Sequence, residues 1–170
     1  SGNEKLHQRR RRLVGPLFGQ EMPRRQGVAA HVVGILAPDP QHIVVGVDDA
    51  ALAQYTTDAF VGVAAALAKK YAPALILTGA SFQMRDFSAA LAADLSAGLA
   101  IDATNVAIEG DQISAVRPSH GGNVINTVVF AARPAVVAVR KQSFPEAQEQ
   151  PGRAGEVMRE AMPGVEIRTK

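Results

Sequence analysis

Cysteine is missing altogether from this sequence of 170 residues. Its absence excludes a disulfide framework, a thiolate nucleophile and cysteine-ligated zinc, and it fits the reducing, cytoplasmic setting that we expect. Long apolar runs are missing as well. The longest uncharged apolar run, residues 59–68, is far shorter than the roughly 20 residues that a membrane-spanning helix needs. Because no apolar stretch follows the N-terminal charges either, we expect neither a membrane span nor a secretory leader.

Several catalytic signatures are also missing. The sequence has no Gly-x-Gly-x-x-Gly motif after a strand and no phosphate loop with Gly-Lys-Ser/Thr. Residues 79–83, GASFQ, begin like a nucleophile elbow, but Gln83 stands where the second glycine belongs. A hydrolase in which Ser81 is the nucleophile, with His120 and an aspartate, stays open as an alternative. The four histidines have no metal-ligand spacing, so we expect no metal site.

Positive charge is concentrated at the N-terminus. Residues 1–26 hold seven Lys and Arg against two acids, a net charge of +5, and the remainder holds eleven against fourteen, a net charge of −3. The overall charge of +2 therefore combines a basic arm with a mildly acidic body. A solvated or partner-wrapped arm is favoured over nucleic-acid binding, because no aromatic residues are interleaved with the arginines to stack on bases.

The clearest pattern is a strand that leads directly into a helix, within residues 73–98. The apolar run 74–77 predicts a strand buried on both faces. Residues 87–95 carry an apolar side chain at every fourth position, which predicts an amphipathic helix that Gly98 ends in a left-handed conformation. This is the βα half of a βαβ unit, in which ligands bind beyond the carboxyl ends of the strands.

Other apolar runs predict further strands and one more long helix. That helix begins after Thr56 or Thr57, which caps it, and runs to about Tyr71 before Pro73 stops it. Short helical turns are expected at 48–54 and 156–162. Strands are expected at residues 27–36, 42–47, 99–102, 105–108, 112–117, 123–131, 135–140 and 165–168. Because four of these strands follow one another without a helix, we predict an α/β fold with a mostly parallel sheet and an antiparallel extension.

Two groups of residues are candidate binding sites. The first group places hydroxyl groups, a cation and a helix N-terminus after the 74–77 strand, an arrangement that suits anion binding. The alternative is that these residues only begin a helix that Asp86 caps. The second follows the 112–117 strand, where paired glycines permit unusual backbone angles; it is either a binding loop or only a tight turn. The first group is Thr78, Ser81, Arg85 and Asp86, and the second is Arg117, His120, Gly121, Gly122 and Asn123.

A pair of acids follows the 42–47 strand. Asp48 and Asp49 could bind a metal or a ribose, but a role in capping the next helical turn is favoured.

The order and spacing of several short motifs resemble those of the N-terminal domain of the electron transfer flavoprotein alpha subunit. The resemblance covers residues 44–144, although His120 stands where the family usually has tyrosine. The matching segments are DDAALAQYTTDAF, ALILTGAS, RDFSAALAADLSAGLAIDAT, RPSHGGN, ARPAVVAVR and Phe144. The family implies a three-layer Rossmann-like fold related to adenine nucleotide alpha-hydrolases. It also implies three segments: a basic arm (1–26), the alpha-subunit domain (27–145), and a linker with a terminal strand (146–170) that leads to an FAD domain.

The function implied by the resemblance is that of an electron carrier subunit without autonomous catalysis. In the family this domain packs on the beta subunit and supports FAD, which carries electrons from acyl-CoA or other dehydrogenases to a quinone reductase or another acceptor. The FAD is held mostly by a C-terminal domain for which these 170 residues hold no match, so we expect this chain alone not to bind FAD. AMP, which the related beta subunit carries, remains a ligand to consider. The alternative function is a standalone adenine-nucleotide-binding module that uses Thr78, Ser81, Arg85 and Asp86.

Overall fold

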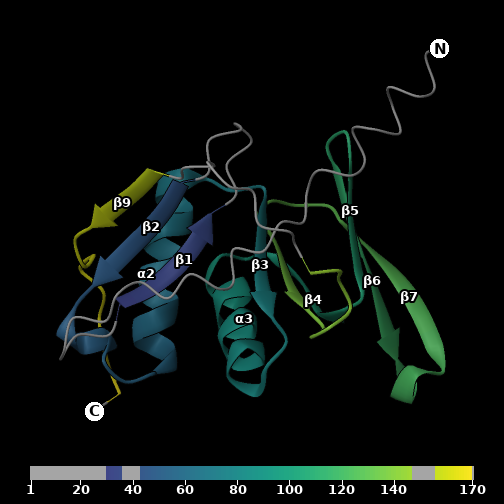
Figure 1. The fold of residues 1–170 in the computed structure, drawn as a ribbon, viewed down its shortest axis with the longest axis horizontal. Helices are drawn as coiled ribbons and strands as arrows, with labels where there is room; N and C mark the ends of the chain where they lie inside the picture. The colour runs from purple at the N-terminus through teal and green to yellow at the C-terminus, as the bar shows by residue number, and fades with distance from the viewer. Residues whose placement is uncertain (1–29, 36–42, 147–155, 170) are drawn as a thin grey trace.

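The computed structural model of the protein describes residues 30–35, 43–146 and 156–169. Two α-helices and three three-stranded sheets make up this part of the chain (Figure 1). The strands are β1 (Ala30–Ile35), β2 (Ile43–Asp48), β3 (Leu75–Gly79), β4 (Gly98–Ala103), β5 (Asn105–Glu109), β6 (Gln112–Ser119), β7 (Val124–Phe130), β8 (Ala135–Val139) and β9 (Glu156–Glu160). The helices are η1 (Ala50–Leu52), α2 (Thr57–Tyr71), α3 (Phe82–Asp94) and η2 (His120–Gly122). The predicted basic arm lies outside the described residues.

The central sheet is parallel, with the strand order β3-β8-β4. Its middle strand β8 is apolar without alternation, and residues 135–138 are fully buried. A strand covered on both faces needs an uninterrupted apolar run, which AVVAV supplies. Both β3 and β4 lie within one residue of their predicted starts.

An antiparallel sheet, β5-β6-β7, follows β4 directly. Its hairpin turns at Gly110, whose φ of +60° suits glycine. The backbone N–H of Thr104 donates to the Val116 carbonyl and so joins this sheet to the end of β4. Phe130 packs with the small buried side chains of β4 and β8. The structure thus confirms the predicted α/β class with a parallel sheet and an antiparallel extension.

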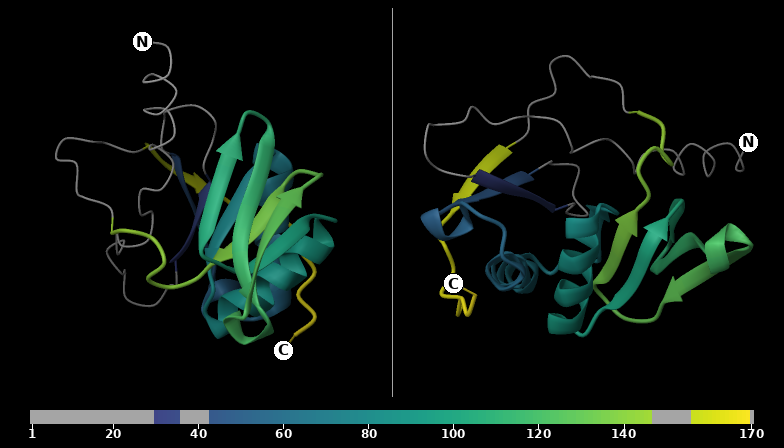
Figure 2. Two further views of the ribbon diagram at one scale, coloured as in Figure 1. Left: turned by 90° about the vertical axis from the view of Figure 1, so that its right-hand side faces the viewer. Right: turned by 90° about the horizontal axis from the view of Figure 1, so that it is seen from below.

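The third sheet has the order β1-β2-β9, with β1 antiparallel and β9 parallel to β2. It and the antiparallel sheet lie at opposite ends of the molecule, with the helices between them (Figure 2). The expected helical turn at 156–162 was wrong, because residues 156–160 form β9. An isolated helix of that length is marginal in water, whereas pairing with β2 satisfies the backbone of the same residues.

The strand expected at residues 165–168 is also absent from the described structure. The backbone N–H groups of Arg168 and Thr169 instead donate to Oδ2 of Asp58, at 2.6 and 2.8 Å. Val165 packs against α2, where it lies within 3 Å of the place that a Cβ on Gly62 would occupy. The terminal segment is therefore held by a carboxylate and an apolar contact in place of a strand partner.

Helix α2 is buried on two sides. One side packs on β2 through Val63 and Leu67, and the other packs on α3 through Val61 and Ala64. This double contact explains the many alanines, because small side chains let neighbouring elements approach closely. The helix begins after Thr56 and ends at Tyr71, close to the predicted bounds, although the Thr56 side chain makes no capping hydrogen bond.

Helix α3 begins after Ser81, whose Oγ accepts a hydrogen bond from the Met84 N–H. Its end differs from the prediction: Leu95 is the C-cap, Ser96 has a φ of +51°, and Gly98 begins β4. Gly98 is required for a different reason, because a Cβ there would lie 2.8 Å from Cδ1 of Phe130. Close packing with a distant side chain therefore selects this glycine, and helix termination does not.

Candidate functional site

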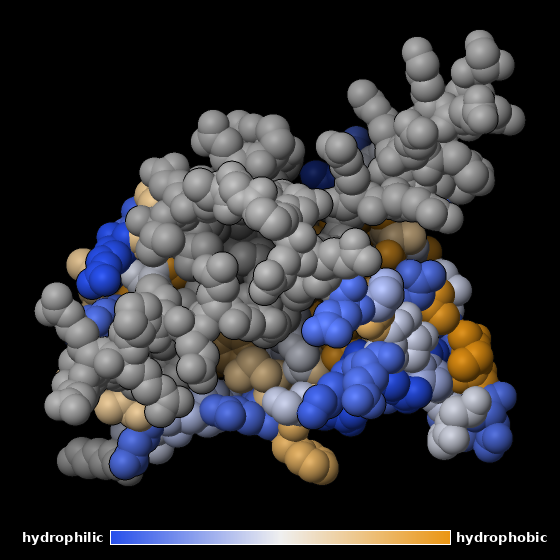
Figure 3. Space-filling model, in the orientation of Figure 1, coloured by the Kyte–Doolittle hydropathy of each residue, from blue (hydrophilic) through white to orange (hydrophobic). Residues whose placement is uncertain are grey.

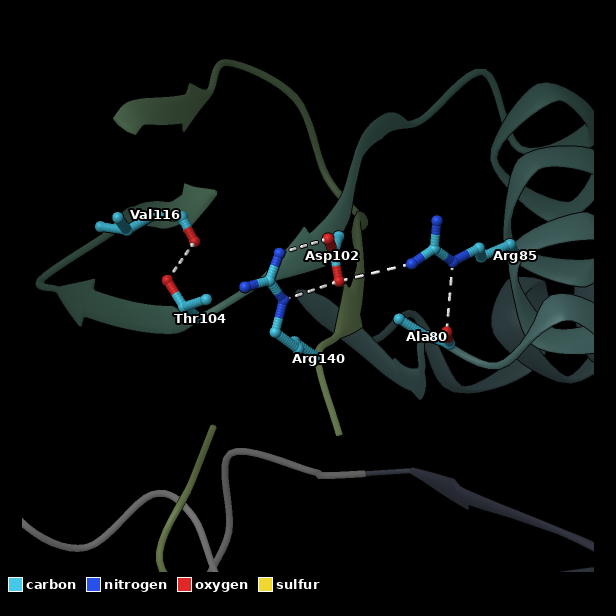
Figure 4. Close-up of polar contacts among 6 residues, drawn as sticks. All are labelled: Ala80, Arg85, Asp102, Thr104, Val116 and Arg140. Carbon is cyan, nitrogen blue, oxygen red and sulfur yellow. Dashed lines mark hydrogen bonds and ion pairs between the residues drawn. The ribbon is translucent and has the colours of Figure 1, made fainter. Parts of the chain in front are cut away.

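The carboxyl ends of β3, β8 and β4 meet around Asp102. The register of β4 against β8 shifts between Ile101 and Ala103, and Asp102 takes a φ of +67° in this bulge. Arg140, directly after β8, holds the carboxylate with two bonds, from Nε to Oδ1 at 3.0 Å and from Nη2 to Oδ2 at 2.7 Å (Figure 4). The bulge thus gives the end of the sheet a fixed, bidentate ion pair.

Arg85 approaches the same carboxylate from α3. Its Nη2 lies 3.4 Å from Oδ1 of Asp102, and its Nε donates to the carbonyl of Ala80 at 3.2 Å (Figure 4). Ser81 caps the helix, so the first turn of α3 has a defined start and the Arg85 side chain lies over the strand ends. The bond to Ala80 fixes one edge of the guanidinium.

Arg117 lies on β6, and its charge acts on the same carboxylate. It lies on the same face of that strand as buried Ala115, two residues away, and therefore faces the parallel sheet. Its Nε is buried and has no hydrogen-bond partner among the described residues. The hydrogen bond from Arg140 and the charges of Arg140, Arg85 and Arg117 together hold the pKa of Asp102 below its ordinary value. Arg85, Arg117 and Arg140 around Asp102 are called the arginine cluster below.

Three residues of the first predicted group are used within the fold. Thr78 and Ser88 form a buried hydroxyl pair, with their oxygens 2.6 Å apart, that joins β3 to α3. Asp86 is not the helix cap; its Oδ2 accepts hydrogen bonds from Thr57 at 2.6 Å and from Tyr55 at 3.0 Å. These bonds hold the pKa of Asp86 below its ordinary value and join α3 to the start of α2. Only Arg85 of this group belongs to the arginine cluster.

The second predicted group is divided in the structure. Arg117 joins the arginine cluster, while His120, Gly121, Gly122 and Asn123 form an exposed turn between β6 and β7. The turn needs its glycines, because Gly121 and Gly122 have φ values of +68° and +96°. The chain reverses tightly here, as the turn alternative predicted, and a role in binding stays a prediction.

The hydrolase alternative gains no support from the geometry. Ser81 Oγ is engaged by Met84, and His120 Nδ1 lies 3.1 Å from Ser119 Oγ. No hydrogen bond joins Ser81 to His120 in the described structure. Asp49 caps η1 by accepting from the Ala51 N–H, as the favoured interpretation of this acid predicted.

Sequence reasoning missed Asp102 and Arg140 as site residues, although both lie in the segments that carry the resemblance. The available signal was a charged residue at the end of each apolar strand, in LAIDA and in VVAVR. Among the described residues, no group of three or more His, Asp or Glu side chains could hold a metal ion. In the same part of the chain, no helix is both long enough and apolar enough to cross a bilayer.

Comparison with known proteins places this geometry in a family. The electron transfer flavoprotein domain matches residues 32–163. The chain belongs to the electron transfer flavoprotein family. This match includes β2 through β9 and the whole arginine cluster, and the resemblance stated from the sequence is confirmed.

Curated relatives carry the names Protein FixB and electron transfer flavoprotein subunit alpha. The chain is 35% identical over 122 residues to Protein FixB of Clostridium saccharobutylicum, covering 69% of this chain and 36% of that protein. It is 35% identical over 119 residues to the electron transfer flavoprotein subunit alpha of Thermoanaerobacterium thermosaccharolyticum, with the same two coverages. The subunit alpha of Megasphaera elsdenii is 31% identical over 120 residues, again covering 69% of this chain and 36% of that protein. The chain thus matches 36% of the length of each of these relatives.

Proposed function

We propose that this chain is the N-terminal domain of an electron transfer flavoprotein alpha subunit and acts as a scaffold without catalysis of its own. In this role it packs on a beta subunit and supports a flavin that accepts electrons from acyl-CoA or other dehydrogenases and passes them to a quinone reductase or another acceptor. The observation that carries the proposal is the family match, which spans residues 32–163 of 170. The division into arm, domain and linker, and a cytoplasmic location, are parts of the same proposal.

The antiparallel sheet offers a surface for the beta subunit. Strand β7 lies at the edge of this sheet, and Ile125 and Val129 on its outer face are 64% and 53% exposed. Apolar surface is visible on the side of the molecule where β7 lies (Figure 3). An exposed edge strand with apolar side chains is a surface that a partner chain commonly covers. We call Ile125 and Val129 the β7 patch.

The FAD of the proposed complete protein is assigned outside this chain. The described side chains at the carboxyl ends of the parallel strands are charged and paired with one another, which does not suit a flavin ring. No step of electron transfer is therefore assigned to them. The purified chain is expected to elute without flavin absorbance and to retain none after incubation with FAD and gel filtration.

Complex formation tests the proposal. The full chain is mixed with a purified electron transfer flavoprotein beta subunit, and the complex is detected by light scattering coupled to size-exclusion chromatography. Ile125→Asp combined with Val129→Asp is expected to weaken the complex at least about tenfold, because charge is placed in a buried apolar contact. Ile167→Asp is the matched control, since Ile167 is 38% exposed but lies in the C-terminal segment, away from β7.

One outcome contradicts the scaffold role, and a second contradicts the assignment of its interface to the β7 patch. One is that no complex forms at micromolar concentrations with beta subunits of several relatives. The other is that the β7 patch variant and the Ile167→Asp control bind equally well, which would place the interface elsewhere.

A further inference from the structure

The arginine cluster carries more positive charge than its single acid neutralises. The guanidinium groups of Arg85 and Arg140 contact the Asp102 carboxylate. The charge of Arg117 lies near enough to act on the same carboxylate, so the three arginines and one acid together carry a charge of +2. Both outer arginines reach solvent, because the side chains of Arg85 and Arg140 are 45% and 44% exposed. An anion approaching from solvent therefore meets two accessible guanidinium groups and a third, Arg117, on the neighbouring strand.

Many hydrogen-bond donors of the cluster remain free for a ligand. Each guanidinium has five N–H donors in a planar fork. Asp102 and the Ala80 carbonyl engage Nε and Nη2 of Arg85, and Asp102 engages Nε and Nη2 of Arg140. The Nη1 group of each arginine makes no bond to these acceptors, and in Figure 4 both point away from Asp102. Asp102 thus orients the two guanidinium groups through Nη2 of Arg85 and through Nε and Nη2 of Arg140, and it does not engage Nη1 of either.

The third arginine adds a donor with an unmet requirement. The Nε of Arg117 is buried and has no partner among the described residues. Leaving a buried N–H group without a hydrogen-bond partner destabilises the folded protein. A ligand oxygen that accepted a hydrogen bond from this N–H would remove part of that destabilisation.

We propose that Arg85, Arg117 and Arg140 form a binding site for a phosphoryl group at the carboxyl ends of the parallel strands. A phosphate monoester carries about −1.5 to −2 charges at neutral pH, which matches the unneutralised charge of the cluster. Its three terminal oxygens also match the planar forks of several guanidinium groups. A carboxylate would offset only half of this charge. Arg117 lies on the opposite face of the antiparallel sheet from the β7 patch, and the site does not depend on the scaffold role.

The phosphoryl group has two sources, inorganic phosphate and a nucleotide. Phe82 distinguishes them, because it is 94% exposed and lies three residues before Arg85 in the first turn of α3. Residues three apart on a helix are neighbours, so an aromatic face lies next to the cluster. A base stacked on Phe82 would strengthen nucleotide binding and leave phosphate binding unchanged.

Calorimetric titration of the full chain tests the site, with inorganic phosphate and AMP as separate ligands and acetate at equal ionic strength as the reference anion. Saturable binding of phosphate, AMP or both in the millimolar range or tighter is expected, and acetate should bind more weakly. Arg85→Gln and Arg117→Gln should each weaken phosphate binding about tenfold, the effect of losing one charge-assisted contact. Arg168→Gln is the matched control, because Arg168 is an exposed arginine paired with Glu166 outside the cluster. It should bind phosphate as the wild type does.

The variant Phe82→Ala distinguishes inorganic phosphate from a nucleotide as the source of the phosphoryl group. This variant should bind phosphate normally, and a selective loss of AMP affinity would identify a nucleotide as the source. Equal, unchanged affinities would identify inorganic phosphate.

Thermal unfolding of each variant shows whether it is folded. Should Arg117→Gln not fold, Arg85→Gln and the rescue variant Arg85→Lys still decide the matter, because Arg85 is half exposed. The proposal is overturned if the wild type shows no saturable phosphate or AMP binding, or if Arg85→Gln and Arg168→Gln bind alike.

Discussion

Asp102 and Arg140 lie 38 residues apart in sequence and form a bidentate ion pair across the ends of two parallel strands, with distances of 3.0 and 2.7 Å. The side chain of Asp102 is 23% exposed, so water screens the pair only in part. The pair therefore anchors β4 to the residue that follows β8. It also sets the orientation of the arginine cluster.

Replacing Asp102 by Asn should reduce the free energy of unfolding at pH 7 by about 1 kcal/mol. The effect is kept small because the partner Arg140 is half exposed and water screens the ion pair. The pKa of Asp102 is lowered in the folded state, so the carboxylate stabilises the fold at pH values above its unfolded-state pKa. This contribution is lost as the pH falls through the lower, folded-state pKa. Urea unfolding between pH 7 and pH 2 should show the difference between wild type and Asp102→Asn shrinking toward zero below about pH 4. A difference that stays constant with pH would mean that the carboxylate charge is not the cause.

Replacing Gly98 by Ala should destabilise the fold by about 1–3 kcal/mol, as overpacking of a core commonly does. The added Cβ would lie 2.8 Å from Cδ1 of Phe130, so the ring or β4 must move. Gly79→Ala is the control, since a Cβ on Gly79 would meet nothing within 4 Å. Urea unfolding of both variants measures the contrast. In a Phe130→Ala background, Gly98→Ala should cost clearly less, and an unchanged cost would show that this contact is not responsible.

The buried hydroxyl pair of Thr78 and Ser88 should show coupling in a double-mutant cycle. Ser88→Ala leaves the Thr78 hydroxyl buried without this partner and should cost about 1–3 kcal/mol. Thr78→Val combined with Ser88→Ala removes that unpaired hydroxyl. The double variant should therefore be destabilised by less than the sum of the two single destabilisations. Chemical unfolding of the wild type, both single variants and the double variant provides the measurement. Strict additivity would show that the pair makes no net interaction.

Replacing Asp58 by Ala should release the C-terminal segment from the start of α2. The N–H groups of Thr169 and Arg168 both donate to the Asp58 carboxylate, and the bond from Thr169 contributes most to holding the pKa of Asp58 far below its ordinary value. Hydrogen exchange should be faster at these two amides in Asp58→Ala, while amides of β8 should exchange at their wild-type rates. Because the carboxylate stays charged well into the acid range, the wild-type protection should persist below pH 4. Protection equal to that of the wild type would contradict the anchoring role.

Elements that rest on local pattern were predictable from the sequence. Local patterns within a few neighbouring residues predicted several elements. They are the apolar run of β8, the helical spacing in α2 and α3, and the turn at Gly110. The candidate turns after β3 and β6 were found for the same reason. Arg85 and Arg117 were named, but the sequence did not show that they approach a common carboxylate.

What the sequence by itself determined is the α/β class, the order of most elements and, through its ordered motifs, the family. Only the tertiary structure decided that residues 156–160 pair with β2, that Gly98 packs closely against Phe130, and that Asp102 pairs with Arg85 and Arg140 from separate elements. The physical reason is the range of the interactions. Periodicity and turn chemistry act within a few residues, whereas sheet pairing, close packing and ion pairs join residues that are tens of positions apart and are chosen only when the whole chain is packed.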